Sequence, residues 1–202
     1  MNLPNLLTLS RIFLVPLLVV VLLTKFEGRL IFGVRKELIG AAIFGLASLT
    51  DWLDGYVARR RKQVTTLGQV IDPLADKLLI SAALISLVQM GLAPAWMVAV
   101  IIGREFAVTG LRSIAYSRGV VMPARPLGKV KMVAQVVAIV LLILGRDHLR
   151  GFVVLGQIAL WLVLIAAVVS AVDYYRRFNR LANPKIADFT LARERAERKK
   201  IG

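Results

Sequence analysis

Six apolar stretches, each close to the length of a membrane-spanning helix, occupy most of this chain. A helix that crosses the hydrocarbon core of a bilayer needs about 20 mostly apolar residues. The chain is 58% hydrophobic and 19% charged, whereas soluble domains are about 25% charged. We therefore expect an all-α, polytopic membrane protein. Its six transmembrane helices are predicted over residues 7–23, 38–57, 70–90, 94–116, 130–144 (with a start near Gly128) and 152–172.

The Lys and Arg residues give the expected orientation of these helices. The net charge is +15, and the basic residues gather in the second-to-third and fourth-to-fifth connections and in the tail. Cytoplasmic segments carry the excess of Lys and Arg, so both termini should be cytoplasmic. We expect a multi-pass protein of the cell inner (plasma) membrane, with a six-helix transmembrane domain over 1–178 and a basic cytoplasmic tail over 179–202. The charge fits lipid headgroups and not nucleic acid.

Four aspartates interrupt the apolar pattern, at Asp51, Asp54, Asp72 and Asp76. A carboxylate inside a membrane helix is costly unless something compensates for it. Spacings of three and four place each pair on one helix face, and the topology brings both pairs to the cytoplasmic ends of two neighbouring helices. Oxygen-only sites suit Mg²⁺ or Mn²⁺. Two such ions can stabilise the attacking and leaving oxygens of a phosphoryl displacement. The aspartates therefore predict a metal site, with one or, as we expect, two ions, for a reaction on phosphate.

Composition narrows the chemistry further. The chain has no cysteine, which excludes disulfides, thiol nucleophiles and Fe–S sites. Its one histidine, His148, lies between two apolar segments and far from the aspartates in sequence. A general base near the aspartates is therefore expected to be a carboxylate.

Small and polar residues follow the first aspartate pair. Gly55 and Ala58 lack bulk and would let a flat or charged group approach the backbone. Arg59 can pair with a phosphate through its planar fork. Thr65 can donate a hydrogen bond, and Gly68 precedes the third apolar segment. Taken singly, the small residues fit helix packing equally well.

The run as a whole, D-x2-D-G-x2-A-R-x8-G-x3-D-x3-D from Asp51 to Asp76, resembles the signature of the CDP-alcohol phosphatidyltransferase family. The resemblance implies that Asp51, Asp54 and Asp72 hold the metal ions, with Asp76 also at the site. Asp76 would be the catalytic base for the acceptor hydroxyl, whose oxygen attacks the β-phosphorus of CDP-diacylglycerol and expels CMP. The resemblance also implies a homodimer. The CDP-lipid would be bound by Asp51, Gly55, Ala58, Arg59, Thr65 and Gly68.

The acceptor depends on residues outside this run. The segments NLPNLLTLSR, GREFAVTGLR and GKVK are similar to the glycerol-3-phosphate branch of the family. This similarity implies glycerol 3-phosphate as the acceptor; inositol phosphate and serine are the alternatives. An anionic acceptor needs cations, and the candidates are Arg104, Arg112, Lys129 and Lys131. The alternative for each of these cations is a role in topology or in an ion pair. For Arg104 the partner would be Glu105 or one of the motif aspartates.

Three polar residues at the start of the first helix, Asn5, Thr8 and Arg11, are candidates for supporting the site. They are spaced by three and share a face if the helix begins by Asn5. Hydrogen bonds between packed helices are the alternative role for them.

A divalent-cation transporter is the alternative from a different functional class. It would use the aspartates as a translocation site and would need ionisable groups that lead to both faces of the membrane. Here the acids crowd toward one face, and this arrangement favours the enzyme.

Overall fold

The computed structural model describes residues 3–24, 30–31, 34–61, 66–117, 126–145 and 150–182. Side chains are described for residues 10–24, 34–50, 74–115, 131–145, 151–176 and 179.

Six helices make up almost all of the described chain. Each of the six expected helices is present, and most extend past the apolar stretch that predicted them. The fifth begins at Pro126, because proline suits the first turn of a helix. A two-stranded antiparallel ribbon, which the sequence did not indicate, pairs Leu30 with Arg35. The elements are α1 (Leu3–Leu23), β1 (Leu30–Ile31), β2 (Val34–Arg35), α2 (Lys36–Arg61), α3 (Thr66–Gln89), α4 (Ala95–Ser117), α5 (Pro126–Gly145) and α6 (Arg150–Ala182).

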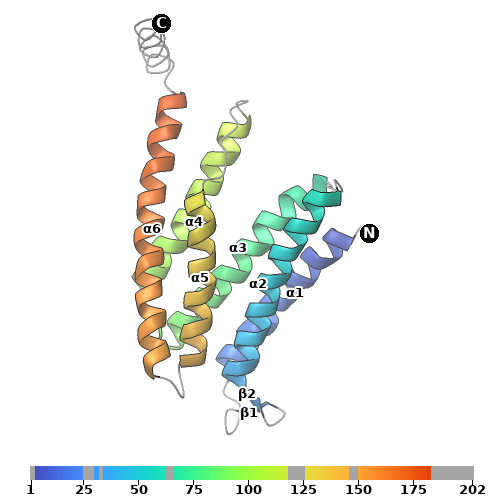
Figure 1. Ribbon diagram of the computed structural model, residues 1–202, viewed down its shortest axis with the longest axis vertical. Coiled ribbons are helices and arrows are strands. Elements are labelled where there is room, and N and C mark those ends of the chain that lie inside the picture. The colour runs from blue at the N-terminus through green and yellow to red at the C-terminus, as the bar shows by residue number, and fades with distance from the viewer. Residues whose placement is uncertain are drawn as a thin grey trace, which may run out of the picture.

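The helices pack in two groups (Figure 1). In one group α1 lies against both α2 and α3, and in the other α6 lies against α4 and α5. Contacts of α2 with α5, and of α3 with α4 and α5, join the groups. Within the described residues α2 and α3 touch each other little, because each packs mainly on α1. Although the connection between α2 and α3 is short, the two helices are therefore positioned mainly by their packing on α1.

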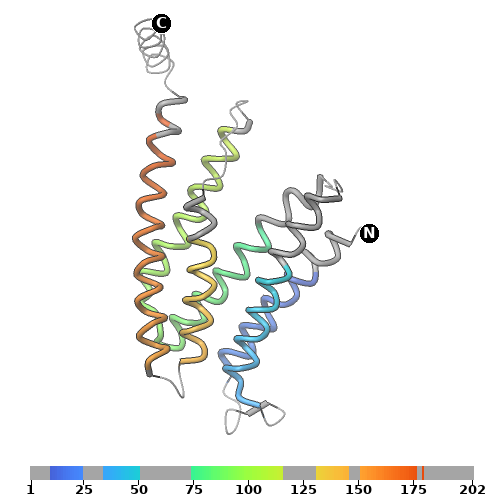
Figure 2. Tube along the Cα trace, in the orientation of Figure 1, coloured from blue at the N-terminus to red at the C-terminus, as the bar shows by residue number. Residues whose placement is uncertain are grey.

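Successive helices alternate in direction, as the trace in Figure 2 shows. The end of α2, the start of α3, the end of α4, the start of α5 and the end of α6 consequently share one end of the bundle. We call this the site end. We predicted from the sequence that the four aspartates lie together at this end of the bundle, and the helix directions agree with that prediction.

One apolar core runs through both groups. Phe44 of α2, Leu84 of α3, Met97 of α4, Ile139 of α5 and Leu160 of α6 are all fully or almost fully buried. Side chains of this size dominate the packing energy of a helical bundle. The core fixes the relative positions of the helices that lead to the site end.

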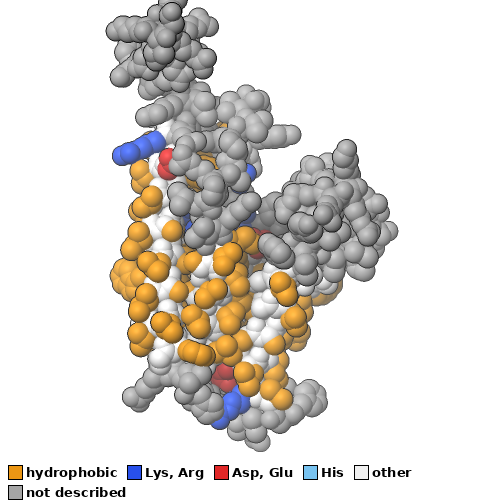
Figure 3. Space-filling model, viewed as in Figure 1, with side chains coloured by type: hydrophobic (Ala, Val, Ile, Leu, Met, Phe, Trp, Pro, Cys, Tyr) orange, Lys and Arg blue, Asp and Glu red, His pale blue; other side chains and the backbone are white. Residues whose placement is uncertain are grey.

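The outer flank of the bundle is also apolar. Figure 3 shows hydrophobic side chains over its middle, with the described charged side chains of this face toward the two ends. Within the described residues one helical segment, Gly151–Arg176, is long and apolar enough to span a membrane, with a hydropathy of 2.7. Two described apolar segments, Ser10–Leu23 and Lys131–Gly145, are shorter. An exposed apolar surface of this extent is typical of contact with lipid.

The end opposite the site is closed by specific backbone contacts. Gly91 adopts a φ of 72° directly after α3, a conformation that favours glycine. Leu92 N–H donates to the Leu87 carbonyl at 2.9 Å, and this bond ends α3 with a six-residue reverse turn. Nearby, the buried Lys36 donates to the carbonyls of Leu22 and Thr24 at the end of α1. These contacts hold the turns without using any residue of the site end.

Close approach of α5 and α6 depends on Gly156. A Cβ at this position would lie 2.7 Å from Leu142 Cγ and 3.1 Å from the Leu142 backbone nitrogen. We expect Gly156→Ala to lower the free energy of unfolding by about 1–3 kcal/mol, because overpacking forces the helices apart. Gly151→Ala on the same helix is the matched control, since a Cβ there meets nothing within 4 Å. Thermal unfolding in detergent measures both, and equal melting temperatures would contradict the prediction.

Candidate active site

A cavity of about 250 Å³ lies between α3, α4, α5 and α6, in the halves of these helices that face the site end. Four basic and two acidic side chains line it, together with polar and apolar ones. The excess of basic groups gives the cavity a positive charge that favours an anion. The lining residues are Asp76, Lys77, Ile80, Ser81, Ile102, Arg104, Glu105, Val108, Thr109, Arg112, Lys131, Met132, Gln135 and Tyr174.

Helical periodicity brings these side chains to the cavity. On α4, Arg104 and Arg112 are two turns apart and therefore lie on one face. On α5, Lys131 and Gln135 are one turn apart. Asp76 lies in the third turn of α3 and lines the same cavity. Each helix thus contributes a short polar stripe in an otherwise apolar stretch.

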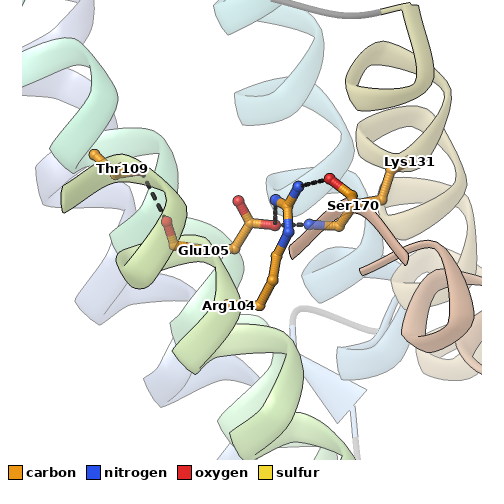
Figure 4. A network of polar contacts seen from close by, with 5 residues as sticks. All are labelled: Arg104, Glu105, Thr109, Lys131 and Ser170. Atoms are coloured by element: carbon orange, nitrogen blue, oxygen red, sulfur yellow. Dashed lines mark hydrogen bonds and ion pairs between the residues drawn. The ribbon is translucent and has the colours of Figure 1, made fainter. Parts of the chain in front are cut away.

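The most closely connected side chains form the network drawn in Figure 4. Arg104 Nη1 donates to Glu105 Oε1 at 3.2 Å, and Arg104 Nη2 donates to Ser170 Oγ of α6. Lys131 Nζ pairs with the same Glu105 oxygen. Thr109 Oγ1 donates to the Glu105 backbone carbonyl at 2.8 Å. One carboxylate oxygen therefore bridges cations from two helices, α4 and α5.

Burial differs across this network. The exposed fraction of the side chain is 4% for Lys131 and 10% for Arg104, but 25% for Glu105. Arg104 Nε is buried and has no hydrogen-bond partner. A buried cation is costly unless an anion or several hydrogen bonds compensate for it. The two cations are therefore fixed parts of the wall, and the carboxylate is the accessible member.

The four aspartates lie on the helices that the sequence predicted. Asp51 and Asp54 are in α2, and Asp72 and Asp76 are in α3, so both spacings fall within continuous helix. The side chains of Asp51, Asp54 and Asp72 lie outside the described residues. The Asp76 side chain is described; it is half-buried and lines the cavity. The structure thus places the expected base beside the cluster of cations.

For the remaining motif positions the structure describes at most the helix in which each one lies. Gly55, Ala58 and Arg59 lie within α2 and Gly68 lies within α3, with side-chain surroundings outside the described residues. Thr65 lies outside the described residues altogether.

Three of the four cations expected at the acceptor, Arg104, Arg112 and Lys131, meet in the cavity. The fourth, Lys129, lies in α5, and its side chain is outside the described residues. The ion pair of Arg104 with Glu105, which was the alternative role for this arginine, is also present. Arg104 therefore lines the cavity and is paired at the same time.

The polar residues at the start of α1 are described only in part. The helix begins at Leu3, so Asn5, Thr8 and Arg11 do share a face as expected. The Arg11 side chain is buried, with 3% exposed, and this agrees with a position inside the bundle. The side chains of Asn5 and Thr8 lie outside the described residues.

Sequence reasoning missed several residues of the cavity. Gln135 and Tyr174 line it, and Ser170 anchors Arg104. Gln135 is 2% exposed, and its Nε2 is a buried donor without a hydrogen-bond partner. A buried donor of this kind is costly unless a ligand or water completes it. Its position one turn after Lys131, in an apolar stretch, was the available signal.

A helical bundle with an apolar flank, and with a carboxylate beside a buried basic cavity, has the features of a membrane enzyme that acts on an anionic substrate. Residues 1–172 match the family model described as CDP-alcohol phosphatidyltransferase. The chain belongs to this family and is therefore a phosphatidyltransferase of this class. Family membership and the apolar helix together indicate a membrane-associated protein.

Several curated relatives are similar over most of their length. A Bacillus subtilis protein, "CDP-diacylglycerol--glycerol-3-phosphate 3-phosphatidyltransferase", is 49% identical over 87% of this chain and 94% of its own length. A Rickettsia felis protein of the same name is 35% identical, with the same coverage. A Mycobacterium tuberculosis "Probable phosphatidylglycerophosphate synthase" is 39% identical over 87% of this chain and 81% of its own length.

Proposed function

We propose that this enzyme transfers the phosphatidyl group of CDP-diacylglycerol to glycerol 3-phosphate, giving phosphatidylglycerophosphate and CMP. The observation that carries the proposal is the cavity, which Asp76 lines together with four cations contributed by three helices. The names of the relatives support the same pair of substrates. The network of Arg104 and Lys131 shows that the cavity can hold an anionic oxygen, since a carboxylate oxygen already lies there.

The cavity suits a small acceptor that carries a phosphate. A phosphate monoester bears a charge of about −1.5 to −2 near neutral pH, and Lys77, Arg104, Arg112 and Lys131 supply the matching positive charge. Serine has no phosphate and would use these cations poorly. Inositol phosphate has the phosphate but a bulkier polyol. We therefore keep glycerol 3-phosphate as the acceptor, with Gln135 as a donor available to a hydroxyl of the acceptor.

In the proposed reaction Asp76 accepts the proton of the acceptor hydroxyl. The oxygen forms a bond to the β-phosphorus of CDP-diacylglycerol, and the bond from that phosphorus to the bridging oxygen breaks. CMP leaves with the bonding electrons, and the phosphatidyl group remains on the acceptor. The cations of the cavity hold the acceptor's own phosphate, which orients the hydroxyl toward Asp76. Holding reactants in this way removes much of the entropic barrier to a two-substrate reaction.

The carboxylates also fit divalent metal ions. Asp51, Asp54, Asp72 and Asp76 are an oxygen-only donor set on two continuous helices, and the end of α2 and the start of α3 both lie at the site end. This chemistry suits Mg²⁺ or Mn²⁺, and we propose two ions held by these four residues. When bound, the ions would neutralise negative charge on the pyrophosphate. Arg59 would bind the same pyrophosphate, with Gly55, Ala58, Thr65 and Gly68 around the cytidine.

We further propose that all six helices span the inner membrane, that both termini and the site end face the cytoplasm, and that the enzyme is a homodimer. The alternation of the helices and the apolar flank support the spans. The excess of Lys and Arg in the connections and tail at the site end supports the cytoplasmic side. The homodimer rests on the family resemblance.

Purified protein tests the proposal directly. We expect labelled CMP to be released from CDP-diacylglycerol with glycerol 3-phosphate and Mg²⁺ or Mn²⁺, and the product to be phosphatidylglycerophosphate. Inositol phosphate and serine are assayed in parallel at the same concentration. Release of CMP with either of these, but not with glycerol 3-phosphate, would refute the assigned acceptor. Activity that survives exhaustive chelation would refute the metal requirement.

A further inference from the structure

Glu105 occupies the place in the cavity where an acceptor's anionic oxygen would be expected. A single oxygen, Oε1, contacts both Arg104 Nη1 and Lys131 Nζ. A phosphate oxygen would make the same two contacts with these cations. The carboxylate therefore acts as the counter-ion of the cavity when no acceptor is bound (Figure 4).

Arg104 and Lys131 are each held in place by more than their contact with Glu105. Arg104 has a second anchor, because its Nη2 donates to Ser170 Oγ of α6. Lys131 is almost fully buried in the wall of α5. Glu105 is the most exposed of the three side chains. It has the rotatable bonds to turn away while its backbone stays in α4. The member of the network that can leave is thus the anion.

Two anions cannot share these cations without mutual repulsion. A bound phosphate and the Glu105 carboxylate would lie at the same pair of nitrogens, where like charges destabilise each other. A buried Arg and Lys also need an anion beside them whether or not substrate is present. One anion at a time meets both requirements.

We propose that Glu105 is a built-in counter-ion which the phosphate of the acceptor displaces. This positioning role rests on the proposed function, and it deepens it by describing how the cavity discriminates among anions. In the empty enzyme the carboxylate compensates the charges of Arg104 and Lys131. An anion must displace it to bind, so an anion with few other contacts, such as inorganic phosphate, binds weakly. An acceptor that also engages Asp76 and Gln135 through its hydroxyls gains enough further contacts to displace it.

Glu105→Gln separates this role from a purely structural one by the sign of its effect. Glutamine keeps the length of the side chain, and its carbonyl oxygen can still accept from both cations, so the packing of the wall is kept although the two cations lose their counter-ion. Without the competing charge, anions should bind more tightly. We expect the KM for glycerol 3-phosphate and the inhibition constant for inorganic phosphate each to fall by about five- to tenfold. The KM for CDP-diacylglycerol should stay within about twofold of the wild-type value. If Glu105 instead holds the cations in place for the substrate, the KM for glycerol 3-phosphate and the inhibition constant for inorganic phosphate both rise.

Glu37→Gln is the matched control. Glu37 is also a buried glutamate, but it lies at the start of α2, at the opposite end of the bundle. The Glu37→Gln variant should have the wild-type KM for glycerol 3-phosphate and the wild-type inhibition constant for inorganic phosphate. A rise, or no change, in the constants of Glu105→Gln would overturn the proposal.

Thermal unfolding gives a second measurement that needs no turnover. Inorganic phosphate added to the protein without CDP-lipid should raise the melting temperature more for Glu105→Gln than for the wild type. At a given concentration, a ligand that binds more tightly stabilises the folded protein more. An equal or smaller shift would overturn the proposal. If the wild-type protein releases no CMP with glycerol 3-phosphate, the proposed function fails, and this shift still decides the role of Glu105.

Discussion

Asp76→Asn is expected to lower kcat by about 10²- to 10⁴-fold, the range that a positioned general base contributes. Asparagine has nearly the same shape as aspartate but cannot accept the proton of the acceptor hydroxyl. Asp76 is half-buried and lines the cavity with the four cations, so an acceptor held by these cations would present its hydroxyl to Asp76. Steady-state CMP release measures kcat. Binding of CDP-diacylglycerol, measured separately at saturating Mg²⁺, should stay close to the wild-type value.

Asp173→Asn provides the comparison for this variant. Asp173 is a partly buried carboxylate on α6 that is not among the residues lining the cavity. Its substitution should change kcat by less than about threefold, since substitutions away from a functional feature have small effects. Near-normal turnover by Asp76→Asn would show that another group takes the proton. A parallel loss of CDP-lipid binding would instead assign Asp76 to the metal site alone.

The helices were predictable because bilayer-length apolar stretches leave the backbone few alternatives to a helix. The ends were less predictable. Beyond Val172 the chain turns polar, yet α6 continues to Ala182, because Arg, Leu and Ala in this segment still favour a helix. The ribbon of β1 and β2 carries no alternating pattern long enough to signal a strand. Apolar length thus predicts that a helix exists but does not predict where it stops.

The candidate site was predictable where local spacing defines it. The aspartates needed only the helix period and the chain direction, and the observed helices α2 and α3 satisfy both. The cations were harder, because a helix that is apolar on nearly all sides gives no sign of which face turns inward. Arg104, Arg112 and Lys131 could be named as candidates, but their meeting in one cavity depends on how α4, α5 and α6 pack.

Gln135 illustrates the same limit. One glutamine in an apolar helix most often serves helix packing. Only the packed bundle shows that its Nε2 is buried and without a hydrogen-bond partner beside the cavity. The pairing of Lys131 with Glu105 likewise joins residues from two helices that no sequence pattern connects. Tertiary packing, and not local sequence, decides which polar groups of an apolar bundle act together.

Lys131→Ala is expected to raise the KM for glycerol 3-phosphate by about 10- to 100-fold. A hydrogen bond to a charged group contributes about 1.5–3 kcal/mol, and the buried position of Lys131 shields its charge from water. The KM for CDP-diacylglycerol should rise much less, because Lys131 lies on the acceptor cavity and outside the aspartate motif. Arg112→Ala should act in the same direction but more weakly, since Arg112 is exposed. Initial rates with each substrate varied in turn measure the two constants.

Lys36→Ala is the matched control for the lysine. Lys36 is as buried as Lys131, but it donates to the carbonyls of Leu22 and Thr24 at the end opposite the site. Its removal should lower thermal stability while leaving the acceptor KM unchanged. This contrast distinguishes loss of an acceptor contact from general loosening of the bundle. Because a mutation that weakens binding of one substrate raises the KM for that substrate, an equal rise in both KM values for Lys131→Ala would mean that the cavity does not bind the acceptor.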